Sequence, residues 1–166
     1  MFHAKFQASN TADFYEKLQH NALFLFNMEP DWLANLSNAS ALIGINMERI
    51  NWAGFYLWRK DALLLGPFWG NPACTRIELN KGVCGTAIAQ MQPQIVDDVS
   101  AFPGHIPCDA QSQSEMVIPF VAANGRLLGV LDIDSPELAR FSKEDLCGMK
   151  RFLDILVKAT DWPEVF

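Results

Sequence analysis

"EMVIPFVAANGRLLGVLDID", residues 115–134, is the stretch of sequence that decides the fold. An Asn-Gly pair separates two apolar runs, and this pair is the strongest short signal for a tight turn between antiparallel strands. Side chains alternate between the two faces of a strand, so Asp132 and Asp134 should share one face. Leu131 and Ile133 should share the opposite face and enter a core. The stretch therefore predicts a β-hairpin with an acidic side and an apolar side.

Further strands and several helices are indicated on both sides of this hairpin. Aromatic and β-branched residues in 50–59, followed by an apolar run in 62–70, predict a second antiparallel hairpin. Ser142, with Asp145 three positions later, resembles a capping box at the start of the last helix. From apolar residues at helical spacing and from turn residues, we expect helices over 11–26, 31–48, 81–90 and 142–160, a brief strand in 93–99 and a polar loop over 100–114.

The order of these elements indicates the fold class. The strands come in antiparallel pairs, with no helix connecting parallel strands, which is typical of an α+β protein. We expect one central antiparallel sheet with the N- and C-terminal helices packed on one face, which leaves the other face to bind a ligand. The length fits a single domain, 1–166, with N-terminal helices in 1–48 and the sheet, loop and C-terminal helix in 49–160.

Composition and charge exclude several functions. The net charge is −6 and the pI is near 4.9, and no cluster of Lys and Arg offers a surface for nucleic acid. No stretch reaches the roughly 18 uninterrupted apolar residues of a membrane span. The first ten residues lack the apolar core and cleavage site of a signal peptide. We therefore expect a cytoplasmic protein without nucleic-acid or membrane partners, whose four cysteines are not a disulfide scaffold.

The acidic side of the sheet is a candidate binding site. Glu115 begins the strand that pairs with the one carrying Asp132 and Asp134, and alternation places Trp52 and Tyr56 on one face of their own strand. Three partly shielded acids cannot all ionise cheaply, so one should keep its proton and serve as a general acid. The alternative is that the two aspartates merely end a strand and cap the following turn, and the pattern leaves both interpretations open.

The cysteines suggest redox chemistry. Cys108 lies in a polar loop three residues after His105, where a thiolate is one interpretation and a structural core thiol is the other. Cys84 lies at an expected helix start, where the positive end of the helix dipole favours a thiolate. A zinc site built from these residues and Cys74 is less favoured, because structural zinc sites use close pairs of cysteines and this chain has none.

Three other residues carry simpler expectations. Cys147, in the last helix, is expected to be a structural or surface thiol. Phe68 and Trp69 are expected to belong to the core rather than to line a ligand site.

The assembled motifs resemble the free methionine-(R)-sulfoxide reductases, a GAF-domain family, over nearly the whole chain. They are "INWAGFYL", "LGPFWGNPAC", "GVCGTA", "VDDV", "GHIPCDAQSQSE" and "GVLDID". The resemblance implies a GAF-like fold. It implies that Cys108 is the nucleophile and that Cys74 and Cys84 are resolving thiols. It also implies a substrate pocket of Glu115, Asp132, Asp134, Trp52 and Tyr56. No role transfers to Cys147, which lies outside the motifs.

The resemblance also implies a reaction and its partners. The Cys108 thiolate would attack the sulfur of free methionine sulfoxide while a carboxyl donates a proton to the oxygen. The resulting sulfenic acid would condense with a second thiol to a disulfide. Thioredoxin, supplied with NADPH through thioredoxin reductase, would reduce this disulfide by exchange. We expect no bound cofactor and no metal, and a homodimer.

The alternative function is a GAF-type sensor domain that binds a small molecule, or reports redox state, without catalysis. A sensor should carry an output domain or a DNA-binding segment. The sequence ends at Phe166 with neither, and this favours the enzyme.

Overall fold

The structure is a computed structural model, and it describes residues 4–104, 110–164 and 166. Its elements in chain order are α1 (Thr11–Phe26), α2 (Trp32–Asn46), β1 (Trp52–Arg59), β2 (Ala62–Gly70), β3 (Arg76–Glu78), α3 (Gly82–Gln90), β4 (Gln94–Val96), the 3-10 helix η1 (Val99–Ala101), β5 (Ser114–Val121), β6 (Leu127–Ser135) and α4 (Lys143–Ala159). Within these ranges, no helix has the length and apolar character needed to cross a bilayer.

The strands form one antiparallel sheet of six strands in the order β3-β2-β1-β6-β5-β4. Both predicted hairpins are present, as β1–β2 and β5–β6, and the pairing of β1 with β6 joins them at the centre of the sheet. The predicted α+β class is confirmed. Two short elements were not predicted: β3, and η1 at the start of the expected polar loop. Both are only three residues long, too short for a periodic pattern to show.

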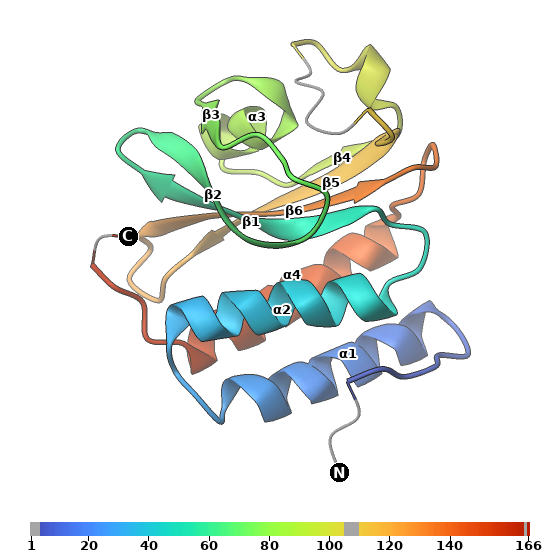
Figure 1. Ribbon diagram of the computed structural model, residues 1–166, viewed down its shortest axis with the longest axis vertical. Coiled ribbons are helices and arrows are strands. Elements are labelled where there is room, and N and C mark those ends of the chain that lie inside the picture. The colour runs from blue at the N-terminus through green and yellow to red at the C-terminus, as the bar shows by residue number, and fades with distance from the viewer. Residues whose placement is uncertain (1–3, 105–109, 165) are drawn as a thin grey trace.

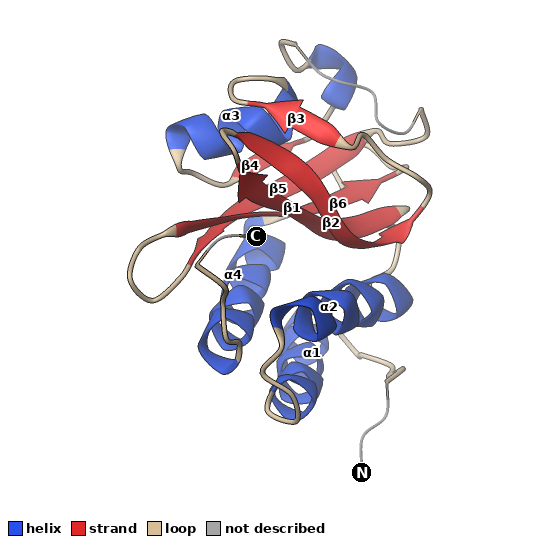
Figure 2. Ribbon diagram, turned by 60° about the vertical axis from the view of Figure 1, so that its left-hand side comes forward, coloured by secondary structure: helices blue, strands red, loops and turns tan. Residues whose placement is uncertain are grey.

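The helices divide between the two faces of the sheet. Figures 1 and 2 show α1, α2 and α4 together below the sheet, while α3 lies above it with the connections around β3 and β4. The prediction that the N- and C-terminal helices cover one face is confirmed. Among the described residues, α3 is the α-helix that packs on the other face, and the predicted site residues lie on this face.

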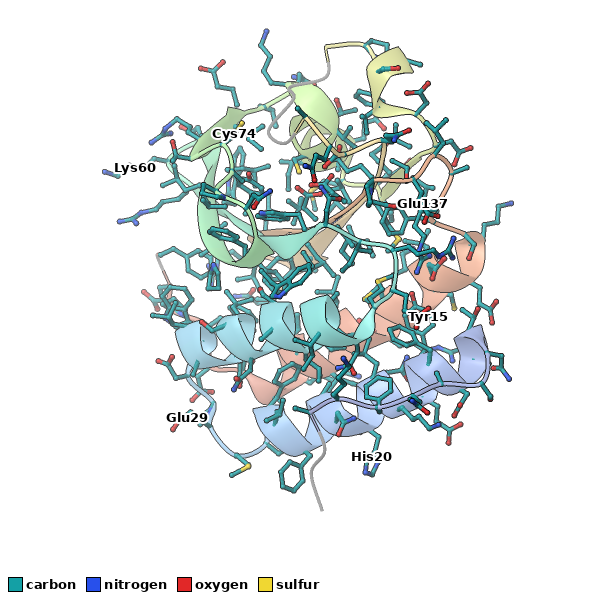
Figure 3. All side chains as sticks on the ribbon, turned by 45° about the vertical axis from the view of Figure 1, so that its right-hand side comes forward. Tyr15, His20, Glu29, Lys60, Cys74 and Glu137 are labelled. Atoms are coloured by element: carbon teal, nitrogen blue, oxygen red, sulfur yellow. The ribbon has the colours of Figure 1, made fainter. Side chains whose placement is uncertain are left out.

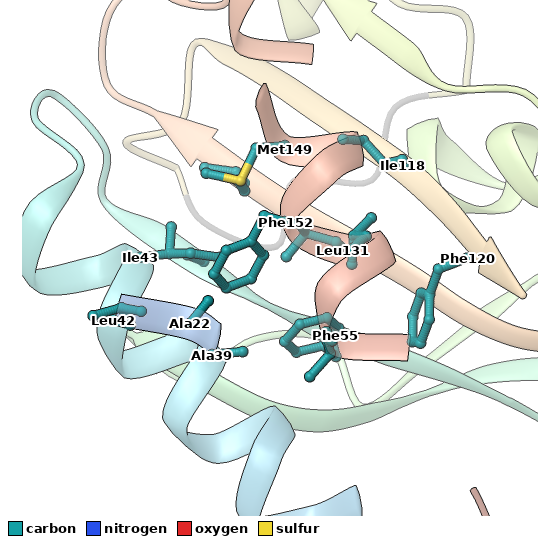
Figure 4. Close-up of a cluster of buried hydrophobic side chains, with 14 of the residues drawn as sticks. Ala22, Ala39, Leu42, Ile43, Phe55, Ile118, Phe120, Leu131, Met149 and Phe152 are labelled. Carbon is teal, nitrogen blue, oxygen red and sulfur yellow. The ribbon is translucent and has the colours of Figure 1, made fainter. Parts of the chain in front are cut away.

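The main core lies between the sheet and the three long helices. It is built from the apolar members of the alternating strands, including Phe55 of β1 and Leu131 of β6, against Phe152 of α4 (Figure 4). Phe26 of α1 meets Phe152 edge to face, with ring centroids 5.8 Å apart. Such a pair contributes about 0.5–1.5 kcal/mol beyond the area it buries. This layer supports the sheet on the face opposite the predicted site residues.

Several polar groups inside the helical layer meet at Asp145. Asp145 completes the predicted capping box of α4 by accepting hydrogen bonds from the backbone and hydroxyl of Ser142, both at 2.8 Å. It also accepts a hydrogen bond from the Tyr15 hydroxyl at 2.8 Å and pairs with Arg140 at 3.4 Å. The capping box predicted from the sequence is therefore confirmed, and it is tied into the helix-side core.

Candidate active site

The register of the central strands gathers the predicted acids on one face of the sheet. Asp134 lies opposite Trp52 of β1 on one side and opposite Glu115 of β5 on the other. Asp132 lies two residues earlier in β6 and points the same way, as does Tyr56 in β1. Residues directly opposite in paired strands extend to the same side of the sheet. The prediction that these five side chains share the face away from the long helices is confirmed.

Helix α3 packs on this face and brings a thiol to the acids. Sγ of Cys84 lies 3.8 Å from Oε1 of Glu115. Ligand atoms of Cys84, Glu115 and Asp132 all lie within 4.8 Å of one another, and the three side chains are buried. Gly85 permits the tight packing of α3 against the end of β3, since a Cβ there would lie 2.3 Å from the carbonyl oxygen of Glu78. We call Cys84, Glu115 and Asp132 the acid–thiol cluster.

The two carboxyls of the acid–thiol cluster hold protons to unusually high pH. Burial, followed by the nearby charges of Asp132 and Asp134, raises the pKa of Glu115 well above its usual value. Burial also raises the pKa of Asp132 to about 7, against the opposing effect of hydrogen bonding with Cys84 and Glu115. Two such groups titrate as a pair, so at least one carboxyl is protonated near neutral pH. This matches the proton-holding acid expected from the sequence.

Cys84 behaves differently from the sequence prediction. It is the third residue of α3, at the helix start that was expected. Burial, followed by the charges of Asp132 and Glu115, nevertheless raises the pKa of its thiol well above the usual value. These effects outweigh a helix dipole, whose favourable interaction with a charge is about 0.3–1 kcal/mol. The prediction that Cys84 favours a thiolate is therefore wrong, and this thiol stays protonated at neutral pH.

An aromatic wall stands beside the acid–thiol cluster. The ring of Trp52 stacks on Tyr56 with centroids 5.8 Å apart and on Phe68 of β2 with centroids 5.4 Å apart. Gly54 leaves room for this stack, because a Cβ there would lie 2.4 Å from Cβ of Phe68 and 2.6 Å from the far edge of Trp52. The wall runs from the buried Tyr56 to Phe68, which is 37% exposed.

The expectation that Phe68 and Trp69 belong to the core is wrong. Both rings are about one-third exposed. Phe68 joins the aromatic wall, and Trp69 packs over Gly44 of α2, where a Cβ would lie 2.3 Å from the indole ring. The signal that could have found Phe68 is the hairpin register, which places it opposite Gly54 and so on the same face as Trp52.

The segment that carries Cys74 is tied to the aromatic wall. The Tyr56 hydroxyl donates a hydrogen bond to the carbonyl oxygen of Cys74 at 3.0 Å. Nε1 of Trp52 donates a hydrogen bond to the carbonyl oxygen of Asn71 at 3.1 Å. Cys74 is half-buried and disulfide-bonded. Figure 3 shows it on the α3 side of the sheet, far from Tyr15 among the long helices.

Of the remaining cysteines and His105, the structure describes Cys147 alone. Cys147 is a free and exposed thiol on α4, away from the site, which confirms the expectation of a surface position. Cys108 and His105 lie outside the described residues, so the nucleophile role of Cys108 stays a prediction. The same holds for the substrate-binding roles of the acids and rings: their placement is described, but their roles are not tested by it.

Comparison with known proteins gives the class first. The GAF domain family model matches residues 21–159, so the chain is a GAF-domain protein. It is 46% identical over 160 residues to the free methionine-R-sulfoxide reductase of Escherichia coli, covering 95% of this chain and 96% of the relative. It is 41% identical over 164 residues to the Saccharomyces cerevisiae protein of the same name, covering 95% of this chain and 89% of the relative.

Solved structures agree with these relatives. The free methionine-R-sulfoxide reductase of Neisseria meningitidis, in complex with its substrate, superposes with a TM-score of 0.89 at 40% identity, covering 96% of this chain and 94% of that one. Within the GAF-domain proteins, the chain therefore belongs to the free methionine-R-sulfoxide reductases, which are oxidoreductases.

Proposed function

We propose that the protein reduces free L-methionine-(R)-sulfoxide to methionine. The observation that carries the proposal is the buried pair Glu115 and Asp132. This pair lies beside an aromatic wall on the face of the sheet against which α3 packs. A free amino acid needs an anionic site for its ammonium group, and the carboxylates can supply one. The rings of Trp52 and Tyr56 can pack the methyl-sulfur end, because a sulfur–aromatic contact is worth about 0.3–1.5 kcal/mol.

The proposed chemical step uses Cys108 as nucleophile. Its thiolate attacks the sulfoxide sulfur, and a protonated carboxyl of the acid–thiol cluster donates a proton to the sulfoxide oxygen. The raised pKa of Glu115 and of Asp132 supports this role, because the donor must still hold its proton at neutral pH. The sulfoxide S–O bond breaks, methionine departs, and the oxygen passes to the sulfur of Cys108 as a sulfenic acid. The sulfoxide sulfur is reduced by two electrons and the cysteine sulfur is oxidised by two.

The second step forms a disulfide, and we assign Cys74 as the main resolving thiol. Condensation of a thiol with the sulfenic acid releases water. Cys74 is half-buried and already disulfide-bonded in the structure, which supports its participation in exchange. Cys84 is less suited, because it is 3% exposed and its pKa is raised well above the usual value. A thiol held protonated is a poor nucleophile.

The reductant, compartment and assembly are part of the same proposal. Thioredoxin, reduced by NADPH through thioredoxin reductase, would return the disulfide to two thiols by exchange. The protein would act in the cytoplasm as a homodimer, without a bound cofactor.

The test is thioredoxin-coupled NADPH oxidation with defined substrates. We expect turnover of free L-methionine-(R)-sulfoxide, no turnover of the S epimer or of a peptide sulfoxide, and loss of turnover in Cys108→Ser. Cys147→Ser is the matched control, since it removes an exposed thiol far from the site and should keep full activity. Equal turnover of the two epimers would contradict the proposal. Binding of the sulfoxide without turnover would favour the sensor alternative.

The resolving thiol is tested separately by mass spectrometry after one turnover without reductant. Cys84→Ser should trap the same disulfide as the unmodified chain, and Cys74→Ser should delay its appearance and leave sulfenic acid on Cys108. The reverse pattern would transfer the main resolving role to Cys84.

A further inference from the structure

We propose that the acid–thiol cluster of Cys84, Glu115 and Asp132 is a binding site for a thiophilic divalent cation, with Zn²⁺ as the preferred ion. The ion would bind at the carboxylates that the proposed function assigns to the substrate ammonium. Its effect on turnover therefore rests on that proposed function, whereas metal binding itself does not. This set of one thiol and two carboxyls differs from the cysteine and histidine ligands that the sequence offers for a zinc site.

The geometry of the cluster is close to that of a zinc site. Tetrahedral Zn²⁺, with Zn–S near 2.3 Å and Zn–O near 2.1 Å, places its ligand atoms about 3.5 Å apart. Sγ of Cys84 and Oε1 of Glu115 are 3.8 Å apart, and all three ligand atoms, including that of Asp132, fall within 4.8 Å of one another. Side-chain movements of about 1 Å would complete the first three coordination positions.

A second observation points independently to a missing ligand. Oδ1 of Asp132 is buried and has no hydrogen-bond partner among the described residues, although the residue is only 6% exposed. A buried polar atom without a partner costs about 1–3 kcal/mol. A cation between Asp132, Glu115 and Cys84 would supply that partner. The ligand of the cluster is thus expected to be positively charged, and small enough to fit between the three groups.

The mixture of sulfur and oxygen ligands selects among cations. Mg²⁺ and Ca²⁺ bind oxygen ligands only, whereas Zn²⁺ accepts thiolate and carboxylate together. Three protein ligands leave a fourth position for water, as in zinc sites that exchange ligands. On binding, the S–H bond of Cys84 breaks, its proton passes to solvent, and an S–Zn bond forms. Any carboxyl proton is released in the same way, and no oxidation or reduction takes place.

Occupation of the cluster would inhibit the proposed reaction. The cation would neutralise the carboxylates that attract the substrate ammonium, and it would displace the proton that the sulfoxide oxygen needs. Free methionine sulfoxide and Zn²⁺ should therefore compete. The protein would lose reductase activity in the presence of excess zinc and regain it when a chelator removes the ion.

The test uses the reduced, metal-free full chain and Co²⁺ as a spectroscopic probe. A thiolate bound to Co²⁺ gives a charge-transfer absorption band. We expect this band in the unmodified chain, in Cys147→Ser, and in a Cys74→Ser, Cys108→Ser double variant, because none of these removes a cluster ligand. We expect its loss in Cys84→Ser. A band that survives in Cys84→Ser, or that disappears in the double variant, would overturn the proposal.

Zinc affinity gives a second measurement that does not depend on Cys84. Competition with a colorimetric chelator should show at least about tenfold weaker Zn²⁺ binding in Asp132→Asn, since even residues outside a coordination shell alter affinity 10–100-fold. Asp154→Asn, on the exposed side of α4, is the matched control and should bind as the unmodified chain does. Equal affinity in Asp132→Asn would refute the site.

The two proposals fail in distinguishable ways. Normal turnover of the metal-free chain without a cobalt band would remove the metal site and leave the reductase. A cobalt band that depends on Cys84, in a chain that turns over no sulfoxide, would leave the metal site and remove the reductase. Zn²⁺ inhibition that raises KM for the sulfoxide with kcat unchanged would support the shared location.

Discussion

Buried acidic side chains on the two faces of the sheet have opposite surroundings. Asp145, on the helix-covered side, is 5% exposed, and Asp132, on the α3 side, is 6% exposed. Asp145 receives hydrogen bonds from Tyr15 and Ser142 and pairs with Arg140. Asp132 faces another carboxyl and a thiol, and one of its oxygens has no partner among the described residues. The buried acid of the helical face is fully paired, whereas the buried acid of the α3 face is not.

This contrast follows from strand alternation. Each central strand sends every second side chain to the helical layer and the others to the α3 side. Phe55 and Leu131 pack among helices, while their neighbours Tyr56 and Asp132 line the site. The larger buried apolar cluster lies in the helical layer, and a smaller one that includes Leu63 and Val117 surrounds the site. Replacing a buried ring of the helical layer and replacing the buried acid Asp132 should therefore change stability in opposite directions.

The largest expected effect comes from the helical face. Phe152→Ala should lower the free energy of unfolding by about 3–5 kcal/mol, because a fully buried ring is replaced by a cavity in the layer that supports the sheet. Urea unfolding measures this change. Leu33→Ala, at a half-exposed position on α2, is the control and should cost less than about 1 kcal/mol. A loss below about 1.5 kcal/mol in Phe152→Ala would break the assignment of stability to this face.

Replacing Asp132 is expected to raise the free energy of unfolding rather than lower it. The pKa of this group rises from 3.8 to about 7 on folding, so the folded protein binds its proton more tightly than the unfolded chain does. Its contribution to stability is therefore fully present below about pH 4 and is lost as the pH rises through about 7. At 1.36 kcal/mol per pH unit, the loss is at most about 4 kcal/mol. Asp132→Asn cannot ionise and should avoid this loss.

Thermal or urea unfolding over a range of pH tests this expectation. Asp132→Asn should be more stable than the unmodified chain at pH 8, and the gain should shrink toward pH 4. Asp154→Asn, at an exposed position, is the control and should stay within about 0.5 kcal/mol at every pH. A variant that is less stable at pH 8 would mean that the charged carboxylate has favourable partners in the folded state.

The sequence predicts which side chains share a face of the sheet. It does not predict properties that depend on how separate elements pack against each other. Alternation within β1 and β6 is enough to place Trp52, Tyr56, Asp132 and Asp134 together, since the period of a strand is fixed by covalent geometry. The protonated state of Cys84 could not be predicted in the same way. It arises because α3 lies directly over Glu115 and Asp132, and nothing local to the helix specifies that contact.

The exposed rings illustrate the same limit. Phe68 is predicted to be a core residue because large aromatic side chains are usually buried. Only the register of β2 against β1 places it on the aromatic wall. The short strand β3 and the 3-10 helix η1 carry too few residues for a periodic pattern. The role of Cys108 rests on the family resemblance and on the proposed chemistry, and it stays a prediction.

The smallest expected effect is that of removing the Tyr56 hydroxyl, which we compare with removing the Tyr15 hydroxyl on the helical face. Tyr56→Phe removes the hydrogen bond from the hydroxyl to the Cys74 carbonyl and leaves the ring in its stack with Trp52. A neutral hydrogen bond contributes about 0.5–1.5 kcal/mol, so Cys74 should be held less firmly and its disulfide should form up to about tenfold more slowly. The first step should change less, since both reacting groups of that step remain. Rapid quenching with mass spectrometry separates the sulfenic acid from the disulfide.

Tyr15→Phe is the matched control, because it removes a hydroxyl that donates to Asp145 on the helical face. It should lower the free energy of unfolding by about 1 kcal/mol and leave both reaction steps unchanged. If Tyr56→Phe behaved in the same way as Tyr15→Phe, the Tyr56 hydroxyl would only stabilise the fold. A selective delay in disulfide formation would instead mean that the α3 face uses an ordinary hydrogen bond to position a reactive segment, whereas the helical face uses the same bond for stability alone.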